Sequence, residues 1–319
     1  MTSSVQTGST PLSGPSAIGG SSLILPVFLS LVAFLAPCTV RGEEPAARLV
    51  PSSKAGGDYL TGLWELDETT RIRRFPITPH RSNYILPFTY NGTPNDAAIQ
   101  EIDPGKELSP YEAEFQISFK VKLWEDVMGW KADLWAAYTQ ISFWQFYDFA
   151  DSSPFRETNY EPEILFNLRT DYRVLGLKGR YLNMGINHQS NGRSEPLSRS
   201  WNRVVANAGF DRGPVALILS AWYRIPEKEE DDDNPDILDY MGYGQLAAYW
   251  FQGKHRFGIA LRNNLDFRDN RGAIQLEWAF PLSRWVSGYV RYFNGYGESL
   301  LDYDHSSNRI GAGFVLKDW

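Results

Sequence analysis

Hydrophobic and polar residues alternate along much of the chain. In segment 115–123 every second residue is apolar, and Gln116, Ser118, Lys120 and Lys122 separate the apolar positions. A period of two indicates a β-strand, because successive side chains of a strand point to opposite faces of the sheet. The segment is therefore predicted to be a strand with one apolar and one polar face. The same alternation recurs in segments 164–174, 275–280 and 309–317.

Clusters of turn-forming residues separate these segments and predict many antiparallel strands. Asn91–Pro94, Asp103–Gly105, Asn270–Gly272 and Asn294-Gly295 are such clusters. Two architectures fit the pattern. A soluble sandwich turns its apolar faces inward, whereas a closed barrel in a membrane turns them toward lipid and its polar faces toward the lumen. The alternation alone does not decide between them.

The stretch Leu23–Pro37 is the one long apolar run of the chain. It is shorter than the roughly 20 residues that a helix needs to cross a bilayer, which excludes a multispan helical membrane protein. The run is typical of the apolar part of a secretory signal, with cleavage expected between Ala36 and Gly42. No Lys or Arg precedes it, which is unusual for a signal peptide, so a retained anchor remains the alternative.

Three features favour the membrane barrel. They are the predicted export signal, the aromatic residues, and the charges of both signs on the polar strand faces. The 277 residues from 43 to 319 provide roughly ten to fourteen strands of about 10 residues with their loops. An even-numbered outer-membrane barrel fits this length. We therefore expect an N-terminal extension with signal peptide at 1–42, an N-terminal periplasmic segment at 43–80 and the barrel at 81–319.

Composition excludes several other classes of protein. The 11 Trp, 17 Tyr and 18 Phe residues argue against a disordered chain. The formal net charge of −7 provides no positive field that would attract nucleic acid. Cys38 is the single cysteine, so the chain forms no intrachain disulfide and no thiolate metal site.

Candidate chemistry is concentrated in segment 187–203. His188 and Ser190 share one face of a predicted strand, and a hairpin centred near Glu195 would place Asn202 opposite His188. A serine, a histidine and an asparagine are the nucleophile, base and orienting group that acyl transfer requires. The alternative is a polar rim where the strands leave the bilayer.

The same segment resembles the active-site signature of the outer-membrane phospholipase A family. The match consists of His188-x-Ser190-Asn191-Gly192-Arg193 and Ser198–Arg203, and it extends from about Tyr84 to the C-terminus. The resemblance implies a twelve-stranded antiparallel barrel of the bacterial outer membrane. It also implies calcium-dependent hydrolysis of phospholipid acyl esters and activation by dimerisation. Three further segments agree with the family: 152–162, 232–243 and 295–300.

The resemblance also assigns roles to individual residues. Ser190 would be the nucleophile, His188 its general base and Asn202 the residue that orients the imidazole. The backbone N–H groups of Ser190 and Gly192 are the expected oxyanion donors. The implied Ca²⁺ ligands are the Arg193 carbonyl and the hydroxyls of Ser198 and, from a second subunit, Ser152. The Arg193 guanidinium would then remain available for lipid phosphate.

Asp233 is a second possible calcium ligand, in a site of the monomer. It closes the acidic run Glu229–Asp233, which by itself is more typical of a solvated loop than of a calcium site. Only the family match at Asn234-Pro235-Asp236 favours the ligand role.

Gln140 is the sequence's indication of a dimer contact. It has the same parity as Leu134 and Trp144, which predicts a lipid-facing amide, and a lipid-facing amide is stabilised by a partner across a two-fold axis. The family resemblance places Gln140 near outward-facing Ile117 and Phe119 at this contact. The alternative is a bulge that turns Gln140 into the lumen.

The remaining histidines, His80, His255 and His305, have no recognisable catalytic neighbours and are expected in loops or at the rim. The expected partners are phospholipid substrate, outer-membrane lipid and a second copy of the chain, without nucleic acid. The rival function is a passive barrel, either a porin-like channel or an inactive structural homologue.

Overall fold

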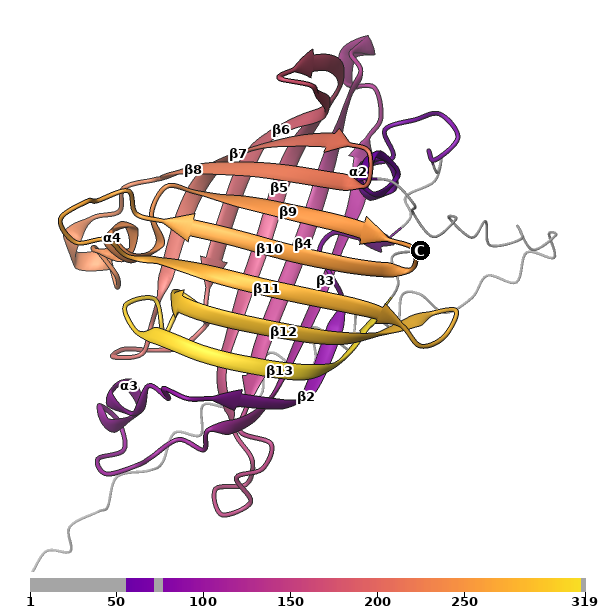
Figure 1. Ribbon diagram of the computed structural model, residues 1–319. Helices are drawn as coiled ribbons and strands as arrows, with labels where there is room; N and C mark the ends of the chain where they lie inside the picture. Colours follow the sequence, from indigo (N-terminus) through magenta and orange to yellow (C-terminus); the bar gives the residue numbers. More distant parts are fainter. Residues whose placement is uncertain (1–55, 72–76, 317–319) are drawn as a thin grey trace, which may run out of the picture. The chain divides into compact units, whose positions relative to one another are not determined.

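Twelve antiparallel strands, β2 to β13, close into a barrel (Figure 1). The computed structural model describes residues 56–71 and 77–316, so the expected signal run Leu23–Pro37 and Cys38 lie outside the described residues. Closure is achieved by β3, which pairs with β2 on one edge and with β4 on the other. The predicted twelve-stranded barrel is confirmed. The division of the chain at residues 42 and 80 stays a prediction.

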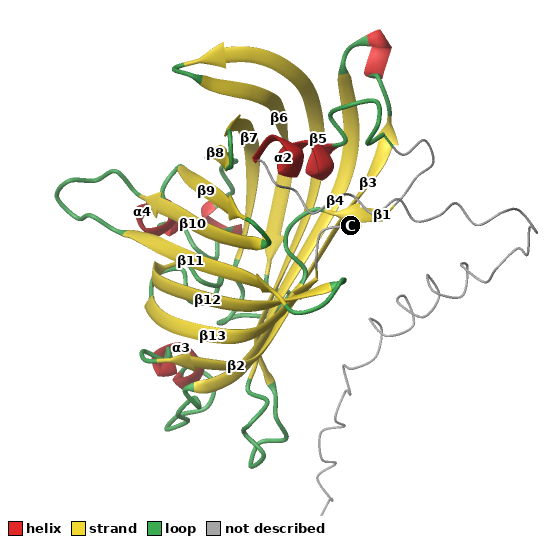
Figure 2. Cartoon of the chain, turned by 45° about the vertical axis from the view of Figure 1, so that its right-hand side comes forward, coloured by secondary structure: helices red, strands yellow, loops and turns green. Residues whose placement is uncertain are grey.

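The connections differ in length at the two ends of the barrel (Figure 2). Residues 175–176, 213–214 and 253–254 form two-residue turns, whereas the loops at 191–199 and 225–243 are long. Helices α3 (Asp96–Gln100) and α4 (Ile237–Met241) and the 3₁₀ turn η2 (Glu229–Asp231) belong to long loops, and the turn η1 (Val127–Gly129) follows β3. None of the described helices has the length and apolarity needed to cross a bilayer. The strands are β1 (Ile77–Pro79), β2 (Tyr84–Asn91), β3 (Tyr111–Trp124), β4 (Ala132–Trp144), β5 (Phe155–Val174), β6 (Leu177–Ser190), β7 (Ser200–Arg212), β8 (Val215–Arg224), β9 (Gly244–Gln252), β10 (His255–Asn263), β11 (Gly272–Pro281), β12 (Val286–Tyr296) and β13 (Ser306–Leu316).

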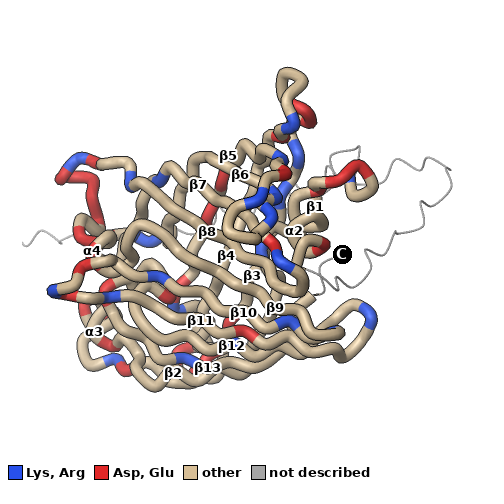
Figure 3. Tube along the Cα trace, turned by 45° about the horizontal axis from the view of Figure 1, so that its top comes forward, with Lys and Arg blue, Asp and Glu red and all other residues tan. Residues whose placement is uncertain are grey.

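Polar side chains fill the lumen and apolar side chains cover the outside. On β3, Ile117 and Phe119 are exposed, whereas Ser118 and Lys120 are buried. Buried charges of opposite sign pair within the lumen, and Figure 3 shows positive and negative positions interspersed along the strands and in the loops. A soluble sandwich would show the reverse polarity. The apolar exterior therefore selects the membrane barrel from the two architectures that the alternation allowed.

Helix α2 (Gly56–Trp64) packs against the inner face of the barrel at the short-turn end. Leu60 and Trp64 join a buried apolar cluster with Trp135 and Leu165, and the Gly56 amide donates to the carbonyl of Gly213 at the β7–β8 turn. A lumen cavity of about 370 Å³ remains. The short-turn end is therefore filled by apolar packing.

His80 lies in the loop between β1 and β2, as predicted, but this loop residue is inside the barrel and has a carboxylate neighbour that the sequence did not indicate. His80 is buried, its ring packs edge-on against Trp64, and its Nε2 lies 2.8 Å from Glu163 Oε2. It directly follows β1, which pairs with β3, and it lines the lumen cavity. Pairing with a buried carboxylate compensates for the desolvation of this ring.

Candidate active site

The β6–β7 hairpin places the predicted site residues side by side on the outer surface. His188 is the register partner of Asn202, and Ser190 is the partner of Ser200. This pairing confirms the register that the sequence predicted. The neighbouring Asn187 and Arg203 are buried in the lumen. His188, Ser190 and Asn202 therefore continue the outward, lipid-facing side of the hairpin.

The imidazole of His188 is held in a defined orientation by Asn202. The Nδ1 atom of His188 lies 2.8 Å from the Oδ1 atom of Asn202. An amide oxygen only accepts hydrogen bonds, so Nδ1 carries a proton, and in the neutral ring the lone pair is on Nε2. The unprotonated Nε2 atom is the tautomer that a general base requires.

Ser190 lies two residues beyond His188 on the same strand face, roughly 6.6 Å along the backbone. Within the described part of the chain, no hydrogen bond joins Ser190 Oγ to His188. Catalytic hydrogen bonds are often long in an enzyme without substrate and tighten when substrate binds. The arrangement therefore has the components of an acyl-transfer site in a relaxed geometry.

Gly192 follows the strand at a position that favours glycine. Its φ is +65°, and a Cβ atom there would lie 3.2 Å from the ring of Tyr160. Its amide donates no hydrogen bond to any of the described residues. The Gly192 N–H therefore has spare capacity to donate to a developing oxyanion.

Asn191 organises the loop between β6 and β7, a role that the sequence analysis missed. The side chain is buried, and its Oδ1 accepts from the amides of Arg193 (3.2 Å) and Arg199 (3.1 Å). Its Nδ2 donates to the carbonyl of Leu197 at 2.8 Å. One amide side chain thus fixes the backbone on both sides of Ser198. The available signal was an asparagine in a predicted loop, because Asn side chains often hydrogen-bond to nearby backbone groups.

The expectation that the Arg193 guanidinium remains available for phosphate was wrong. Its Nη2 donates to the backbone carbonyls of Phe155 (3.3 Å) and Arg156, and its Nε lies 3.3 Å from Glu157 Oε2. These contacts attach the hairpin loop to the start of β5. The guanidinium positions the backbone of the site.

Oxygen donors that suit a hard cation converge beside the hairpin. The Ser198 hydroxyl donates to Asp233 Oδ2 at 2.5 Å. The pKa of Glu195 is raised, chiefly by a side-chain hydrogen bond with the neighbouring Asp233 and less by desolvation and like-charge repulsion. Among the residues the structure describes, no group of three or more His, Cys, Asp or Glu is arranged to hold a metal. Hydroxyl, carboxylate and carbonyl oxygens nevertheless fit Ca²⁺, which accepts this mixture in flexible geometry.

Glu195 is a second residue that the sequence analysis missed. It was considered only as the centre of the hairpin, although an acidic residue three positions before Ser198 was a visible signal. The loop that carries Asp233 is held in place by Arg224, which pairs with Asp232 at 2.5 Å. Asn234 Oδ1 also accepts from the Ser200 amide at 2.9 Å. Loop docking therefore brings Asp233 to the hairpin.

Ser152 is exposed in the β4–β5 loop, with a φ of +62°. No hydrogen bond joins it to Ser190, Ser198 or Asp233 within the described residues. A ligand role for Ser152 thus depends on a second copy of the chain.

Gln140 faces outward, as its parity predicted. Its neighbours Thr139 and Ile141 line the lumen cavity, and Gln140 pairs in register with outward-facing Ile117. The pairing continues without a bulge at this position, so the alternative of a lumen-facing Gln140 is wrong. Gln140 Oε1 accepts from the Tyr138 hydroxyl at 3.1 Å, and Phe119 lies opposite Tyr138.

Comparisons with known proteins agree with this geometry. A family model described as Phospholipase A1 matches residues 60–316. Phospholipase A1 of Escherichia coli K12 is 35% identical over 290 residues, which cover 90% of this chain and 96% of the relative.

Two solved structures are similar over most of the chain. One is an active-site mutant of outer membrane phospholipase A from Escherichia coli, in which an asparagine is replaced by alanine. Its TM-score is 0.74 at 35% identity, with 82% of this chain and 98% of that chain covered. The other is the Salmonella typhi outer membrane phospholipase dimer with bound calcium, which has the same TM-score, identity and coverage. The chain therefore belongs to the phospholipase A1 family.

Proposed function

We propose that the protein hydrolyses acyl esters of phospholipids in the outer membrane, with Ser190 as nucleophile, His188 as general base and Asn202 as the orienting residue. The observation that carries the proposal is the position of these three residues on the lipid-facing side of the hairpin. Polar groups on an apolar surface are costly unless they are paired or used. A bilayer lipid approaches such a surface directly, whereas a solute of the lumen does not reach it.

The reaction follows from the tautomer of His188. Ser190 Oγ attacks the ester carbonyl carbon while its proton moves to His188 Nε2, and the amides of Ser190 and Gly192 donate to the oxyanion. When the tetrahedral intermediate collapses, the bond to the glycerol oxygen breaks and His188 returns the proton to that oxygen. Water then attacks the acyl-enzyme with the same assistance. The products are a lysophospholipid and a fatty acid, and Ser190 is regenerated.

Asn202 is neutral, so it cannot stabilise the imidazolium by charge as an aspartate would. A bound Ca²⁺ ion would supply positive charge near the developing oxyanion. The residues that would hold it are Ser198 through its hydroxyl, Arg193 through its carbonyl, and Ser152 of a second subunit. Asp233, next to Glu195, would hold calcium in a separate site of the monomer.

Dimerisation is proposed to occur through the outward face of β3 and β4. Gln140 lies opposite Ile117 on this face. Phe119, two residues further along β3, lies on the same face opposite Tyr138. An amide surrounded by lipid is stabilised when a second amide meets it across a two-fold axis. The similar Salmonella typhi protein is described as a dimer with bound calcium, which supports a calcium-linked dimer here.

The test is release of fatty acid from phospholipid in mixed micelles, with calcium and with EDTA. We expect hydrolysis with calcium, none with EDTA, and none from the Ser190→Ala variant under either condition. Conductance steps in planar bilayers, without calcium-dependent hydrolysis, would contradict the proposal and identify a passive channel.

A further inference from the structure

Glu227 contacts the site from outside the hairpin. Its Oε1 accepts a hydrogen bond of 2.5 Å from Nδ2 of Asn202, the same side chain whose Oδ1 contacts His188. Glu227 lies in the β8–β9 loop, three residues after the end of β8. The contacts therefore form a continuous chain from Glu227 through Asn202 to His188.

The loop is held at this position by the backbone. The amide of Ile225 donates to the carbonyl of Asn202 at 2.8 Å, which continues the β7–β8 pairing beyond the end of β8. Arg224 is anchored by its contacts with Asp232 and the carbonyl of Pro235. Glu227 is thus presented to Asn202 by an ordered segment.

A carboxylate at this position determines which way the Asn202 amide points. An ionised carboxylate only accepts hydrogen bonds, so it requires the NH₂ group of Asn202 to face it. The amide oxygen must then face His188. In the flipped amide the NH₂ group would donate to His188 Nδ1 and force the proton onto Nε2. That tautomer cannot accept the proton of Ser190.

The charge of Glu227 is not neutralised by another contact. Within the described part of the chain Glu227 forms no ion pair, and its Oε2 is buried without a hydrogen-bond partner. A carboxylate bonded to the Asn202 amide polarises it, which makes Oδ1 a stronger acceptor for the imidazolium. This supplies indirectly the negative charge that a neutral orienting residue lacks.

We propose that Glu227 is a positioning residue of the catalytic site, which fixes the Asn202 amide and through it the tautomer and basicity of His188. The inference rests on the proposed triad and extends it to four residues. Glu227 touches neither the substrate nor the reacting atoms. Its effect is therefore expected in kcat rather than in KM.

The first test is a double-mutant cycle. Glu227→Gln keeps the shape of the side chain but removes the charge and permits the flipped amide. We expect kcat to fall about tenfold, a barrier change of about 1.4 kcal/mol, with KM and the half-saturating calcium concentration unchanged. In an Asn202→Ala background the same substitution should have no further effect, because the residue through which it acts is absent. Glu229→Gln, an exposed acidic residue of the same loop, is the matched control.

The second test moves the carboxylate to residue 202. In the Glu227→Gln background, Asn202→Asp should restore most of the lost kcat, because an aspartate contacts His188 directly and has no amide to flip. A residue that only held the loop would not be replaced in this way. Heat-modifiable migration in gels verifies that each variant is a folded barrel.

Three results would overturn the proposal for Glu227. The first is an unchanged kcat in Glu227→Gln. The second is an equal loss of kcat from Glu227→Gln in the native and the Asn202→Ala backgrounds. The third is a rise in the half-saturating calcium concentration without a change in kcat. If instead Ser190→Ala retained activity, the triad itself would be wrong. The two failures are therefore distinguishable.

Discussion

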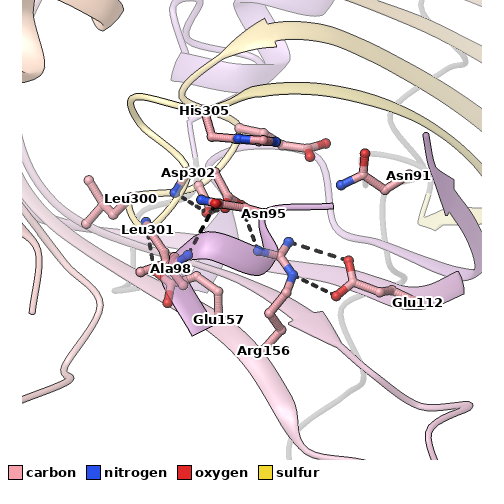
Figure 4. Close-up of polar contacts among 12 residues, drawn as sticks. Asn91, Asn95, Ala98, Glu112, Arg156, Glu157, Leu300, Leu301, Asp302 and His305 are labelled. Atoms are coloured by element: carbon pink, nitrogen blue, oxygen red, sulfur yellow. Dashed lines mark hydrogen bonds and ion pairs between the residues drawn. The ribbon is translucent and has the colours of Figure 1, made fainter. Parts of the chain in front are cut away.

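Two sets of polar residues, one inside the barrel and one on its outer surface, differ in whether their charges are paired with opposite charges. Inside, Arg156 lies between Glu112 and Asp302 (Figure 4), with its Nε 2.7 Å from Glu112 and its Nη1 2.7 Å from Asp302. Asp302 also accepts from Asn95 (3.1 Å) and Ser299 (2.7 Å). Both members of each ion pair are buried, and each has an opposite charge in contact.

The outer set, on the β6–β7 hairpin and at Glu227 of the β8–β9 loop, keeps unused hydrogen-bonding capacity. Ser190 Oγ, the Gly192 amide and Glu227 Oε2 form no hydrogen bond within the described part of the chain. Single unpaired atoms also occur inside, at Arg309 Nη2 and Glu114 Oε2, but both of these residues have an opposite charge in contact, whereas Glu227 forms no ion pair with any described residue. We conclude that the inner set stabilises the barrel and that the outer set is available for chemistry and association. The predictions below test this division.

Ser190→Ala has the largest expected effect. Activity should fall by roughly 10⁴-fold or more, because the nucleophile is lost. The stability of the barrel should stay within about 0.5 kcal/mol, since an outward hydroxyl without a partner contributes little to folding. Fatty-acid release and denaturant unfolding in detergent measure the two quantities. Appreciable residual hydrolysis would remove Ser190 from the catalytic role.

Arg309→Met should give the opposite result. Arg309 is buried on β13, 2.9 Å from Glu298 and 2.5 Å from Glu112, and its loss leaves buried carboxylates undercompensated. We expect a loss of about 3–5 kcal/mol in stability with normal activity per folded molecule.

Unfolding midpoints and activity normalised to heat-modifiable protein measure both effects. Arg268→Met, at an exposed loop position, is the control and should change neither. A stable but inactive Arg309→Met barrel would contradict the conclusion that the inner set stabilises the barrel and the outer set serves catalysis.

Ser152→Ala tests whether the outer set is completed by a second subunit. The calcium concentration for half-maximal activity should rise roughly tenfold, about 1.4 kcal/mol. Dimer yield at fixed calcium should fall as well, because linked equilibria strengthen each other by the same factor. Activity titrations and crosslinking measure these changes, with Ser194→Ala as an exposed serine control. A dimer constant that sedimentation finds equal with and without calcium would disprove the shared site.

Gln140→Leu has the smallest expected effect. Interhelical polar pairs in membranes contribute about 0.6 kcal/mol on average, and an effect of this size would weaken the dimer roughly threefold. Sedimentation equilibrium in detergent measures it. Leu261→Ala, on the outer face of β10 six strands away in either direction, should leave the dimer unchanged. Equal weakening by both substitutions would show that the contact is not on β4.

Much of the site was predictable from sequence because it is local. The alternation gave strands with two unlike faces, and the spacing of His188, Ser190 and Asn202 about the hairpin gave their register, which the pairing confirms. The parity of Gln140 likewise predicted its outward face. In each case the number of residues between two positions of a strand tells whether their side chains point to the same face or to opposite faces. This needs no knowledge of the rest of the fold.

Other features depend on contacts between residues far apart in the chain. Glu227 reaches Asn202 across 25 positions, and His80 reaches Glu163 across 83. The Arg193 guanidinium is occupied by carbonyls at the start of β5. The alternation along a strand predicts none of these contacts. Each one depends on how a loop is placed in space relative to a strand that is distant in the sequence.

The sequence by itself determined that this chain forms amphipathic strands and that one hairpin carries a serine, a histidine and an asparagine in reach of each other. Only the tertiary structure decided which face of each strand lines the lumen. The sheet closes through the β3–β4 pairing, and ion pairs between strands place the polar faces in the interior. The tertiary structure also decided which polar side chains keep unused capacity. The physical reason is that alternation fixes relative directions along a strand, whereas burial and pairing are properties of the closed barrel.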